Sequence, residues 1–331
     1  GSNEKYRIYE YISGFTGSDI SCIDSLPKSK TEIFVSPFDN KDFIGEAYSS
    51  DVDSRTRAFL KIQDGCDYNC SYCTIPMARG NSRSLPMDKV IENAEKIIDA
   101  GYKEIILTGV NIGDYKIDGK NSFYELLQNL DKLNIGRIRI SSIEPNLLTD
   151  EILSLVESSE KIVHHFHIPL QSGNNEVLRL MRRRYKKELY EDLVYKIKNR
   201  LPDSCIGADV IVGFPGETDE IFESSYDFIK SLPINYLHVF SYSERPKTHS
   251  VEIQGKVDGN DIKYRSRILR NLSVSKRSEF YAGSEGKIQE VLFESEEKGM
   301  IEGWTRNYIR VKSNYLKEKE NNIYLVKIKK S

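Results

Sequence analysis

The feature that most constrains the fold is an alternation of apolar strands and helical segments that begins at residue 58. The pattern predicts six strands: 58–63, 104–110, 137–143, 163–170, 206–214 and 236–242. Nearly continuous apolar strands are typical of parallel strands buried on both faces. Polar or glycine-rich residues follow several of them, as in barrels whose sites lie at the carboxyl ends of the strands. A full barrel needs eight units, so we expect an α/β fold with an incomplete, TIM-like (β/α)6 barrel.

The pattern changes near residue 283. A charged helix is predicted over 261–282, after which the hydrophobic period becomes two. The last segment therefore predicts four or five short antiparallel strands in a small all-β barrel. We divide the chain into an N-terminal segment (1–53), an α/β core (54–283) and a C-terminal β-barrel (284–331).

Composition limits the classes of partner and the compartment. The chain has 331 residues, a net charge of −2 and five cysteines. Because the charge is balanced, binding to nucleic acid would need a local basic patch. An odd number of cysteines, three of them clustered, favours a metal site in a reducing compartment, and hence the cytoplasm, over a set of disulfides. The sequence contains no apolar run of membrane-spanning length and no signal peptide, so we expect no membrane partner.

A cysteine motif follows the first predicted strand. Three and two residues separate its members, which are Cys66, Cys70 and Cys73. Three thiolates on a short loop can ligate three irons of a cubane cluster and leave the fourth iron open, as catalytic zinc keeps an open position. A ferredoxin-type cluster needs a fourth cysteine, and neither Cys22 nor Cys205 has the spacing for it. Two alternatives stay open: incidental cysteines, or structural zinc with a distant ligand such as His164 or His167.

The motif and its flanks resemble the radical S-adenosylmethionine (SAM) superfamily and, within it, the methylthiotransferases. The resemblance runs in order through SRTRAFLKIQDGCDYNCSYCTIPMARGNSRS (54–84), LTGVNIG (107–113), ISSIEPN (140–146), HHFHIPLQSGNNEVLRLMRRRY (164–185), DVIVGFPGET (209–218) and LHVFSYSERPKT (237–248). The most similar branch acts on threonylcarbamoyladenosine next to the tRNA anticodon. Sibling branches modify isopentenyladenosine in tRNA or an aspartate of a ribosomal protein. A hypothesis of another class is a non-catalytic RNA-binding module with a structural metal site.

The resemblance implies the cofactors. The three cysteines would hold a [4Fe–4S] cluster, and SAM would bind its open iron. A radical derived from SAM would then remove hydrogen from C2 of the modified adenine at position 37, and a second SAM would supply the methyl group. A flavodoxin-like or similar protein would donate the electron. A second [4Fe–4S] cluster is expected only in the full-length protein, on an N-terminal domain of which residues 1–53 would be a remnant and linker. A fragment of this kind should be incomplete for sulfur insertion.

The same resemblance implies SAM contacts near the strand ends, from Tyr72, Gly109, Asn111, Ser142, Glu144, Gln171, Arg183 and Asp209. Arg183 could pair with the SAM carboxylate, because a guanidinium forks onto a carboxylate. Structural alternatives stay open: a strand-end turn at Asn111, a salt bridge at Glu144, a solvated basic helix end at Arg183 and a structural hydrogen bond at Asp209. One departure from the family is Lys247, where relatives often have glycine.

The C-terminal segment resembles the TRAM module, an OB-like RNA-binding β-barrel. Aromatic and basic side chains are interleaved there at Trp304, Tyr308 and Arg310. Such residues suit stacking on unpaired bases and contact with phosphates, so we expect them to bind the anticodon loop of tRNA. The alternative is a barrel that only packs on the core. A further basic run lies at 179–187 (RLMRRRYKK).

Overall fold

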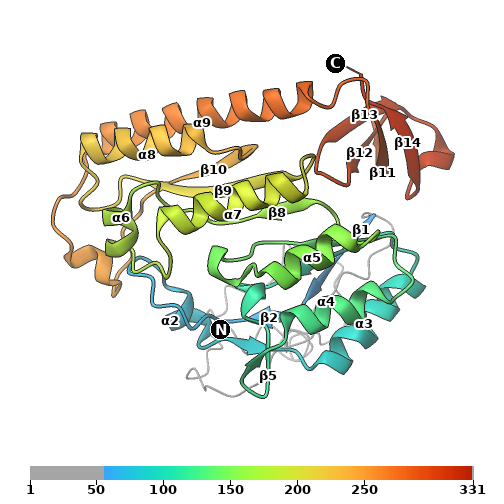
Figure 1. Ribbon diagram of the computed structural model, residues 1–331, viewed down its shortest axis with the longest axis horizontal. Coiled ribbons are helices and arrows are strands. Elements are labelled where there is room, and N and C mark those ends of the chain that lie inside the picture. Colours follow the sequence, from blue (N-terminus) through green and yellow to red (C-terminus); the bar gives the residue numbers. More distant parts are fainter. Residues whose placement is uncertain (1–55, 330–331) are drawn as a thin grey trace, which may run out of the picture.

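The computed structural model describes residues 56–329. Its centre is a curved sheet of parallel strands in chain order: β1 (Arg57–Lys61), β4 (Glu104–Thr108), β7 (Arg137–Ile140), β8 (His165–His167), β9 (Cys205–Val212) and β10 (Tyr236–Ser241). Parallel bridges from Ile138 to Ile162 and from Ser142 to His167 join the β7 and β8 halves. With β1 and β10 at its edges, this is the expected open (β/α)6 arrangement (Figure 1).

Helices cover the outer face of the sheet (Figure 1). They are α3 (Met87–Asp99), α4 (Phe123–Asp131), α5 (Asp150–Ser158), α6 (Asn175–Leu180), α7 (Lys187–Arg200), α8 (Asp219–Ser231) and α9 (Gly259–Ala282). The short helix α2 (Ile75–Arg79) lies beyond the strand ends (Figure 1) and buries none of its residues. Alternate strand residues such as Leu60, Leu107 and Ile138 pack beneath these helices in one continuous core. Thr149 caps the amino end of α5, because its Oγ1 accepts a hydrogen bond from the Ile152 N–H.

The inner face of the sheet carries several charged and polar side chains, which differs from the expectation of strands apolar on both faces. The alternation of RIRI in β7 is the visible sign: Ile138 and Ile140 face the helices, and Arg137 and Arg139 face inward. Glu104 of β4 receives two hydrogen bonds from the Arg139 guanidinium, at 2.7 and 3.2 Å. Charged and polar side chains inside the curved sheet can bind polar molecules there.

The C-terminal segment is a curled antiparallel sheet with the strand order β13-β12-β11-β14. Its strands are β11 (Ile288–Glu297), β12 (Met300–Thr305), β13 (Arg310–Asn314) and β14 (Ile323–Lys327). This sheet lies against the amino ends of the parallel strands. There the buried Arg137 guanidinium donates to the carbonyls of Trp304 (2.8 Å) and Glu290 (3.0 Å). The sheet therefore covers the end of the barrel opposite the cysteine loop.

Several short elements were not predicted from the sequence. They are the hairpin β2 (Gln63–Asp64) with β3 (Arg83–Ser84), the hairpin β5 (Lys116–Ile117) with β6 (Lys120–Asn121), and the 3₁₀ turns Ile112–Asp114, Pro145–Leu147, His249–Glu252 and Lys317–Lys319. Lys247, at the position where the resemblance implies a glycine, has a φ of 68°, the left-handed conformation that glycine adopts easily.

Other predictions are not tested by the described residues. The remnant expected over 1–53 lies outside the described residues, and the three-part division of the chain stays a prediction. Within 56–329, no helix combines the length and the apolar character that crossing a bilayer requires.

Candidate iron–sulfur and SAM site

The three cysteines lie on the loop between β2 and α2, beyond the carboxyl end of β1. The β2–β3 hairpin closes the base of this loop. Gly65 starts the loop with a φ of 71°, and a Cβ there would lie 2.0 Å from the Asn81 carbonyl oxygen. Further along, Ser71 is held from two sides, because its N–H donates to the Met181 carbonyl (3.1 Å) and its carbonyl accepts from the Ser250 N–H (2.8 Å). The loop is thus fixed by neighbours distant in sequence.

Each cysteine sulfur accepts one N–H. Cys66 Sγ accepts from the Tyr68 N–H and Cys73 Sγ from the Ile75 N–H, both at 3.4 Å, and Cys70 Sγ accepts from the Arg183 guanidinium at 3.1 Å. Burial raises the pKa of all three thiols, that of Cys66 to about 11. A bound metal must therefore displace protons, and the donors around the sulfurs stabilise the thiolates that result.

The spacing of the sulfurs distinguishes a cluster from a single ion. Among the described residues, three ligand atoms of His, Cys, Asp or Glu lie within 4.8 Å of one another at one place only. That place is formed by His167, Asp209 and His238. The three cysteine sulfurs are therefore spread more widely. Thiolates on one tetrahedral zinc would lie roughly 3.8 Å apart, given Zn–S bonds of about 2.3 Å. The residues fit a cluster of several irons better than structural zinc.

Arg183 connects the cysteine loop to the loop after β7. Besides Cys70 Sγ, its guanidinium pairs with the Glu144 carboxylate, and it lies 5.1 Å from the centre of the Tyr185 ring. The Arg183 side chain is only 3% exposed, so it is not the solvated helix end that the sequence left open. The ion pair favours the salt-bridge interpretation of Glu144. Tyr72 packs nearby, edge-on to Phe214.

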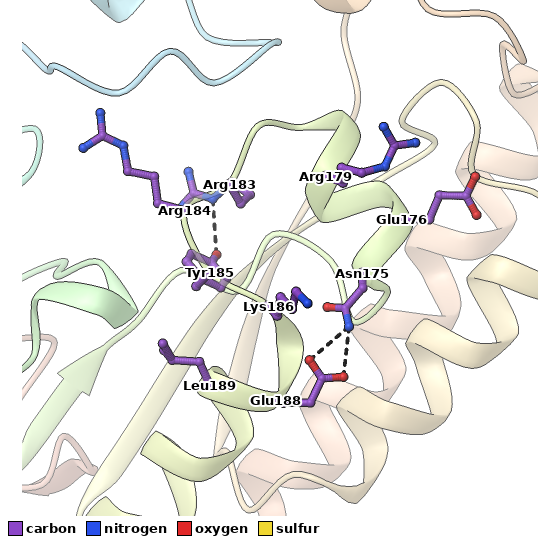
Figure 2. Close-up of a pocket in the computed structure, with 9 residues that line it drawn as sticks. All are labelled: Asn175, Glu176, Arg179, Arg183, Arg184, Tyr185, Lys186, Glu188 and Leu189. Atoms are coloured by element: carbon purple, nitrogen blue, oxygen red, sulfur yellow. Dashed lines mark hydrogen bonds between the residues drawn. The ribbon is translucent and has the colours of Figure 1, made fainter.

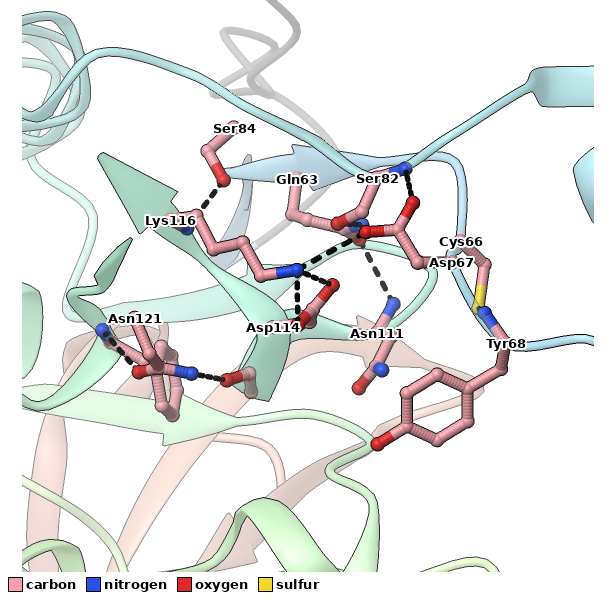
Figure 3. A network of polar contacts seen from close by, with 12 residues as sticks. Gln63, Cys66, Asp67, Tyr68, Ser82, Ser84, Asn111, Asp114, Lys116 and Asn121 are labelled. Carbon is pink, nitrogen blue, oxygen red and sulfur yellow. Dashed lines mark hydrogen bonds and ion pairs between the residues drawn. The ribbon is translucent and has the colours of Figure 1, made fainter. Parts of the chain in front are cut away.

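Gln63 holds the cysteine loop and the loop after β4 together (Figure 3). Its Oε1 accepts hydrogen bonds from the N–H groups of Val110 and Asn111, each at 2.9 Å. Its Nε2 donates to the Gly65 carbonyl at 2.8 Å and to Ser82 Oγ at 3.0 Å. Sequence reasoning missed this residue. The available signal was a glutamine at the end of an apolar strand, directly before the cysteine motif.

Asn111 presents an unsatisfied amide beside this junction. The residue is 4% exposed, and neither Oδ1 nor Nδ2 has a hydrogen-bond partner within the described part of the chain. A buried amide without partners is uncommon and marks a place where a bound polar group would complete it. The neighbouring Gly109 has no room for a side chain, because a Cβ would lie 2.9 Å from Gln63 Oε1. Both residues therefore fit a site for a polar cofactor.

The other predicted SAM contacts follow the next strands. Ser142 forms the bridge to His167, and Gln171 has a φ of 66°, a left-handed conformation at the end of the strand segment. Asp209 lies within β9 rather than at its end, and its Oδ1 accepts hydrogen bonds from His167 (2.8 Å) and His238 (3.2 Å). Burial alone would raise the pKa of Asp209, but these hydrogen bonds hold it at about 2. The structural interpretation of Asp209 is therefore favoured over contact with SAM.

The predicted RNA-binding residues divide into two groups. The Tyr308 ring is stacked between His165 (4.1 Å between centroids) and Trp304 (4.5 Å), so both of its faces are covered. For these two aromatic residues the geometry favours packing on the core, which was the alternative interpretation. Arg310 is exposed and pairs with Glu302, and its contact with RNA stays a prediction.

A pocket of about 890 Å³ lies next to the cysteine loop (Figure 2). Its lining includes Arg179, Arg183, Arg184 and Lys186, from the basic run noted in the sequence. Arg184 reaches back to the loop, where its guanidinium lies 3.9 Å from the centre of the Tyr68 ring and donates to the Asp67 carbonyl. Glu176 and Glu188 also line the pocket, so its positive charge is partly offset.

Comparison with known proteins agrees with this geometry. The family model described as the radical SAM superfamily matches residues 60–229. The chain is 44% identical to the threonylcarbamoyladenosine tRNA methylthiotransferase MtaB of Bacillus subtilis (strain 168), over 84% of this chain and 63% of that protein. It is 33% identical to the protein of the same name from Thermotoga maritima, over 94% of this chain and 69% of that protein.

Two further similarities are to proteins with other names. The chain is 34% identical to the tRNA-2-methylthio-N(6)-dimethylallyladenosine synthase of Aquifex aeolicus, over 86% of this chain and 63% of that protein. In fold, it matches the radical SAM methyltransferase TsrM of Kitasatospora setae with a TM-score of 0.50 and 18% identity, over 58% of this chain and 38% of that one. The chain spans 63% of the length of the MtaB protein of B. subtilis and 63% of the length of the MtaB protein of A. aeolicus, which is less than two thirds of each.

Proposed function

The chain belongs to the radical SAM superfamily and, within it, to the methylthiotransferase family, and from this premise we propose that it carries the catalytic core of an enzyme that methylthiolates N6-threonylcarbamoyladenosine next to the tRNA anticodon. The observation that carries the proposal is the cysteine loop, in which three thiols at the carboxyl edge of the sheet each accept an N–H. The substrate comes from the names of the relatives.

The residues at the carboxyl edge of the sheet have different proposed roles. A [4Fe–4S] cluster with SAM, when bound, supplies one-electron chemistry that can activate an unreactive C–H bond such as adenine C2. Cys66, Cys70 and Cys73 would hold the cluster. Arg183 keeps a buried positive charge at Cys70 Sγ and acts as a positioning residue, since its pairing with Glu144 competes with any role as a ligand of the SAM carboxylate.

SAM itself would bind across the neighbouring loops. The unsatisfied amide of Asn111 supports a hydrogen bond to a polar group of SAM, and Gly109 supports close approach of the backbone. Tyr72, Ser142 and Gln171 complete this proposed site. Tyr72 lies on the cysteine loop, and Ser142 and Gln171 lie just beyond the carboxyl ends of β7 and β8. Asp209 is left out, because two histidines already engage its carboxylate.

The basic pocket beside the cysteine loop suits the phosphates of an anticodon stem-loop. Arg179, Arg184 and Lys186 are exposed there and line one pocket. Phosphate contacts from arginine and lysine fix the position of an RNA, while unpaired bases are read by stacking and edge contacts. A stem-loop bound here would place its loop next to Cys70 and Arg183. We also propose a flavodoxin-like electron donor and a cytoplasmic location, where tRNA and reducing equivalents meet.

Two assays test the proposal. Anaerobically reconstituted chain with dithionite and SAM should produce 5′-deoxyadenosine and methionine, and the Cys70→Ala variant should not. An anticodon stem-loop bearing threonylcarbamoyladenosine should bind more tightly than the same loop with isopentenyladenosine or adenosine. Preference for the isopentenyl loop would favour the sibling branch. Tight colourless zinc with no SAM cleavage would support the RNA-binding module instead.

The pocket has its own control. Arg179→Glu should weaken binding of the stem-loop and reduce its salt dependence, because each lost phosphate contact lowers the slope by about one. Arg267→Glu, at an exposed position on α9, makes the same change of charge away from the pocket and should leave affinity unchanged. Equal affinity of the two variants would place the RNA elsewhere.

A further inference from the structure

We propose that His167, Asp209 and His238 form a second metal site, separate from the cysteine loop, for a single divalent ion of the Zn²⁺ class. Their ligand atoms all lie within 4.8 Å of one another. Asp209 Oδ1 is 2.8 Å from His167 Nε2 and 3.2 Å from His238 Nδ1. Ligands at about 2.1 Å from a tetrahedral ion lie roughly 3.4 Å apart, so small side-chain rotations would admit the ion.

The three side chains come from neighbouring strands of the sheet. His238 stands directly opposite Asp209 in the β9–β10 pairing, and His167 stands opposite Gly207 in the β8–β9 pairing. Because Asp209 and Gly207 are two residues apart on β9, all three side chains point to the same inner face. Strand positions are more rigid than loop positions, so this geometry is set by the fold.

The chemistry of the ligands suits one borderline ion. Two imidazoles and one carboxylate leave a fourth position open, as in catalytic zinc sites and in facial triads of non-haem iron. The open position would take water or an oxygen atom of a molecule bound inside the sheet. This donor set contains no sulfur, which separates it from the thiolates that favour iron–sulfur clusters.

The surroundings tolerate an added positive charge. Arg139, on the same inner face, is engaged by two hydrogen bonds from its guanidinium to Glu104. His165 is the next inward-facing residue on β8. Its Nε2 shares a hydrogen bond with the Tyr236 hydroxyl, and its ring packs against Tyr308 rather than against the three ligands. His238 is 50% exposed, and the other two side chains are 17% and 18% exposed, so an ion can enter from solvent.

Zinc binding by the reconstituted full chain tests the proposal. The chain, with its cluster in place, is dialysed against Zn²⁺, and bound zinc and iron are measured together by mass spectrometry. One zinc per chain is expected in addition to the iron, with X-ray absorption showing nitrogen and oxygen ligands only. Asp209→Asn keeps the shape of the side chain but removes its charge, and His238→Gln changes a half-exposed position, so at least one variant should fold.

Both variants should lose affinity on the order of 10–100-fold or more. His164→Gln and His249→Gln are the matched controls, since these histidines lie outside the group of three ligands and should leave zinc binding unchanged. Zinc that is absent, that binds equally well to folded Asp209→Asn and His238→Gln chains, or that shows sulfur ligands would overturn the proposal. The three residues would then be a hydrogen-bond network only.

Discussion

The Arg183 guanidinium donates a hydrogen bond to Cys70 Sγ over 3.1 Å, across 113 positions of sequence. The same guanidinium pairs with Glu144 on the loop after β7. Because the Arg183 side chain is nearly buried, water screens its charge only weakly. One side chain therefore both stabilises a thiolate and fixes the distance between two loops of the proposed cofactor site.

Arg183→Met should lower both stability and cluster retention. The change keeps the length of the side chain but leaves Glu144 without its ion pair and Cys70 without its donor. Breaking such a pair by removing one partner costs about 3–5 kcal/mol of unfolding free energy at this nearly buried site. Urea unfolding and iron content after reconstitution measure the two effects. Arg182→Met, at the exposed neighbouring position, is the control. Wild-type iron and stability in the Arg183 variant would contradict the assigned role.

Gln63→Leu should separate the cysteine loop from the loop after β4. The substitution leaves the N–H groups of Val110 and Asn111 and the carbonyl of Gly65 without their partner inside the protein. Each buried group without a partner costs about 1–3 kcal/mol, so the midpoint of unfolding should fall clearly and less iron should be retained. Gln128→Leu, on the exposed face of α4, should change neither. Equal behaviour of both variants would mean that Gln63 does not hold the loops.

The strand order could be predicted from the sequence because it depends on local pattern. Apolar segments recur with helical segments between them, and right-handed crossovers leave few ways to arrange parallel strands. The cysteine loop could also be predicted, because its three ligands lie within eight residues, 66–73. Both inferences use information from short windows, which sequence reasoning handles well.

The contacts that organise the site could not be predicted in the same way. Gln63 acts on residues 47 and 48 positions away, and Arg183 acts on Cys70 from a different strand–helix unit. A lone glutamine or arginine carries no spacing that names its partner. The same reason explains Tyr308, an aromatic residue in a basic context that suggests RNA, although its ring packs on His165.

Tyr308→Ala should destabilise the junction between the C-terminal sheet and the parallel strands. The ring is stacked on both faces, and removal of a half-buried aromatic side chain costs about 2–4 kcal/mol. Affinity for the anticodon stem-loop should change less than about twofold if packing is its role. Tyr264→Ala, at a residue that is 56% exposed, is the control for stability. A stable Tyr308 variant that lost RNA binding would restore the stacking role.

Glu104→Gln should make the chain less stable at neutral pH and remove part of its sensitivity to acid. Burial alone would raise the pKa of Glu104, but the charge and hydrogen bonds of Arg139 hold it below the ordinary value of 4.5. A carboxyl group whose pKa is lowered by folding adds stability above its unfolded pKa, and this contribution is lost as the pH falls. Removal of the charge leaves Arg137 and Arg139 without their shared partner, which costs about 3–5 kcal/mol near pH 7.

The difference between the wild-type and Glu104→Gln chains should therefore be largest at pH 7 and narrow below pH 4.5, where the unfolded wild-type chain takes up a proton that the folded chain resists. Urea unfolding at a series of pH values from 7 downward measures this difference directly. Glu125→Gln, on the exposed face of α4, supplies the matched loss of one carboxylate and should give a small difference at every pH. A gap that stays constant through pH 4 would show that the Glu104 carboxyl is not held in its charged form by Arg139.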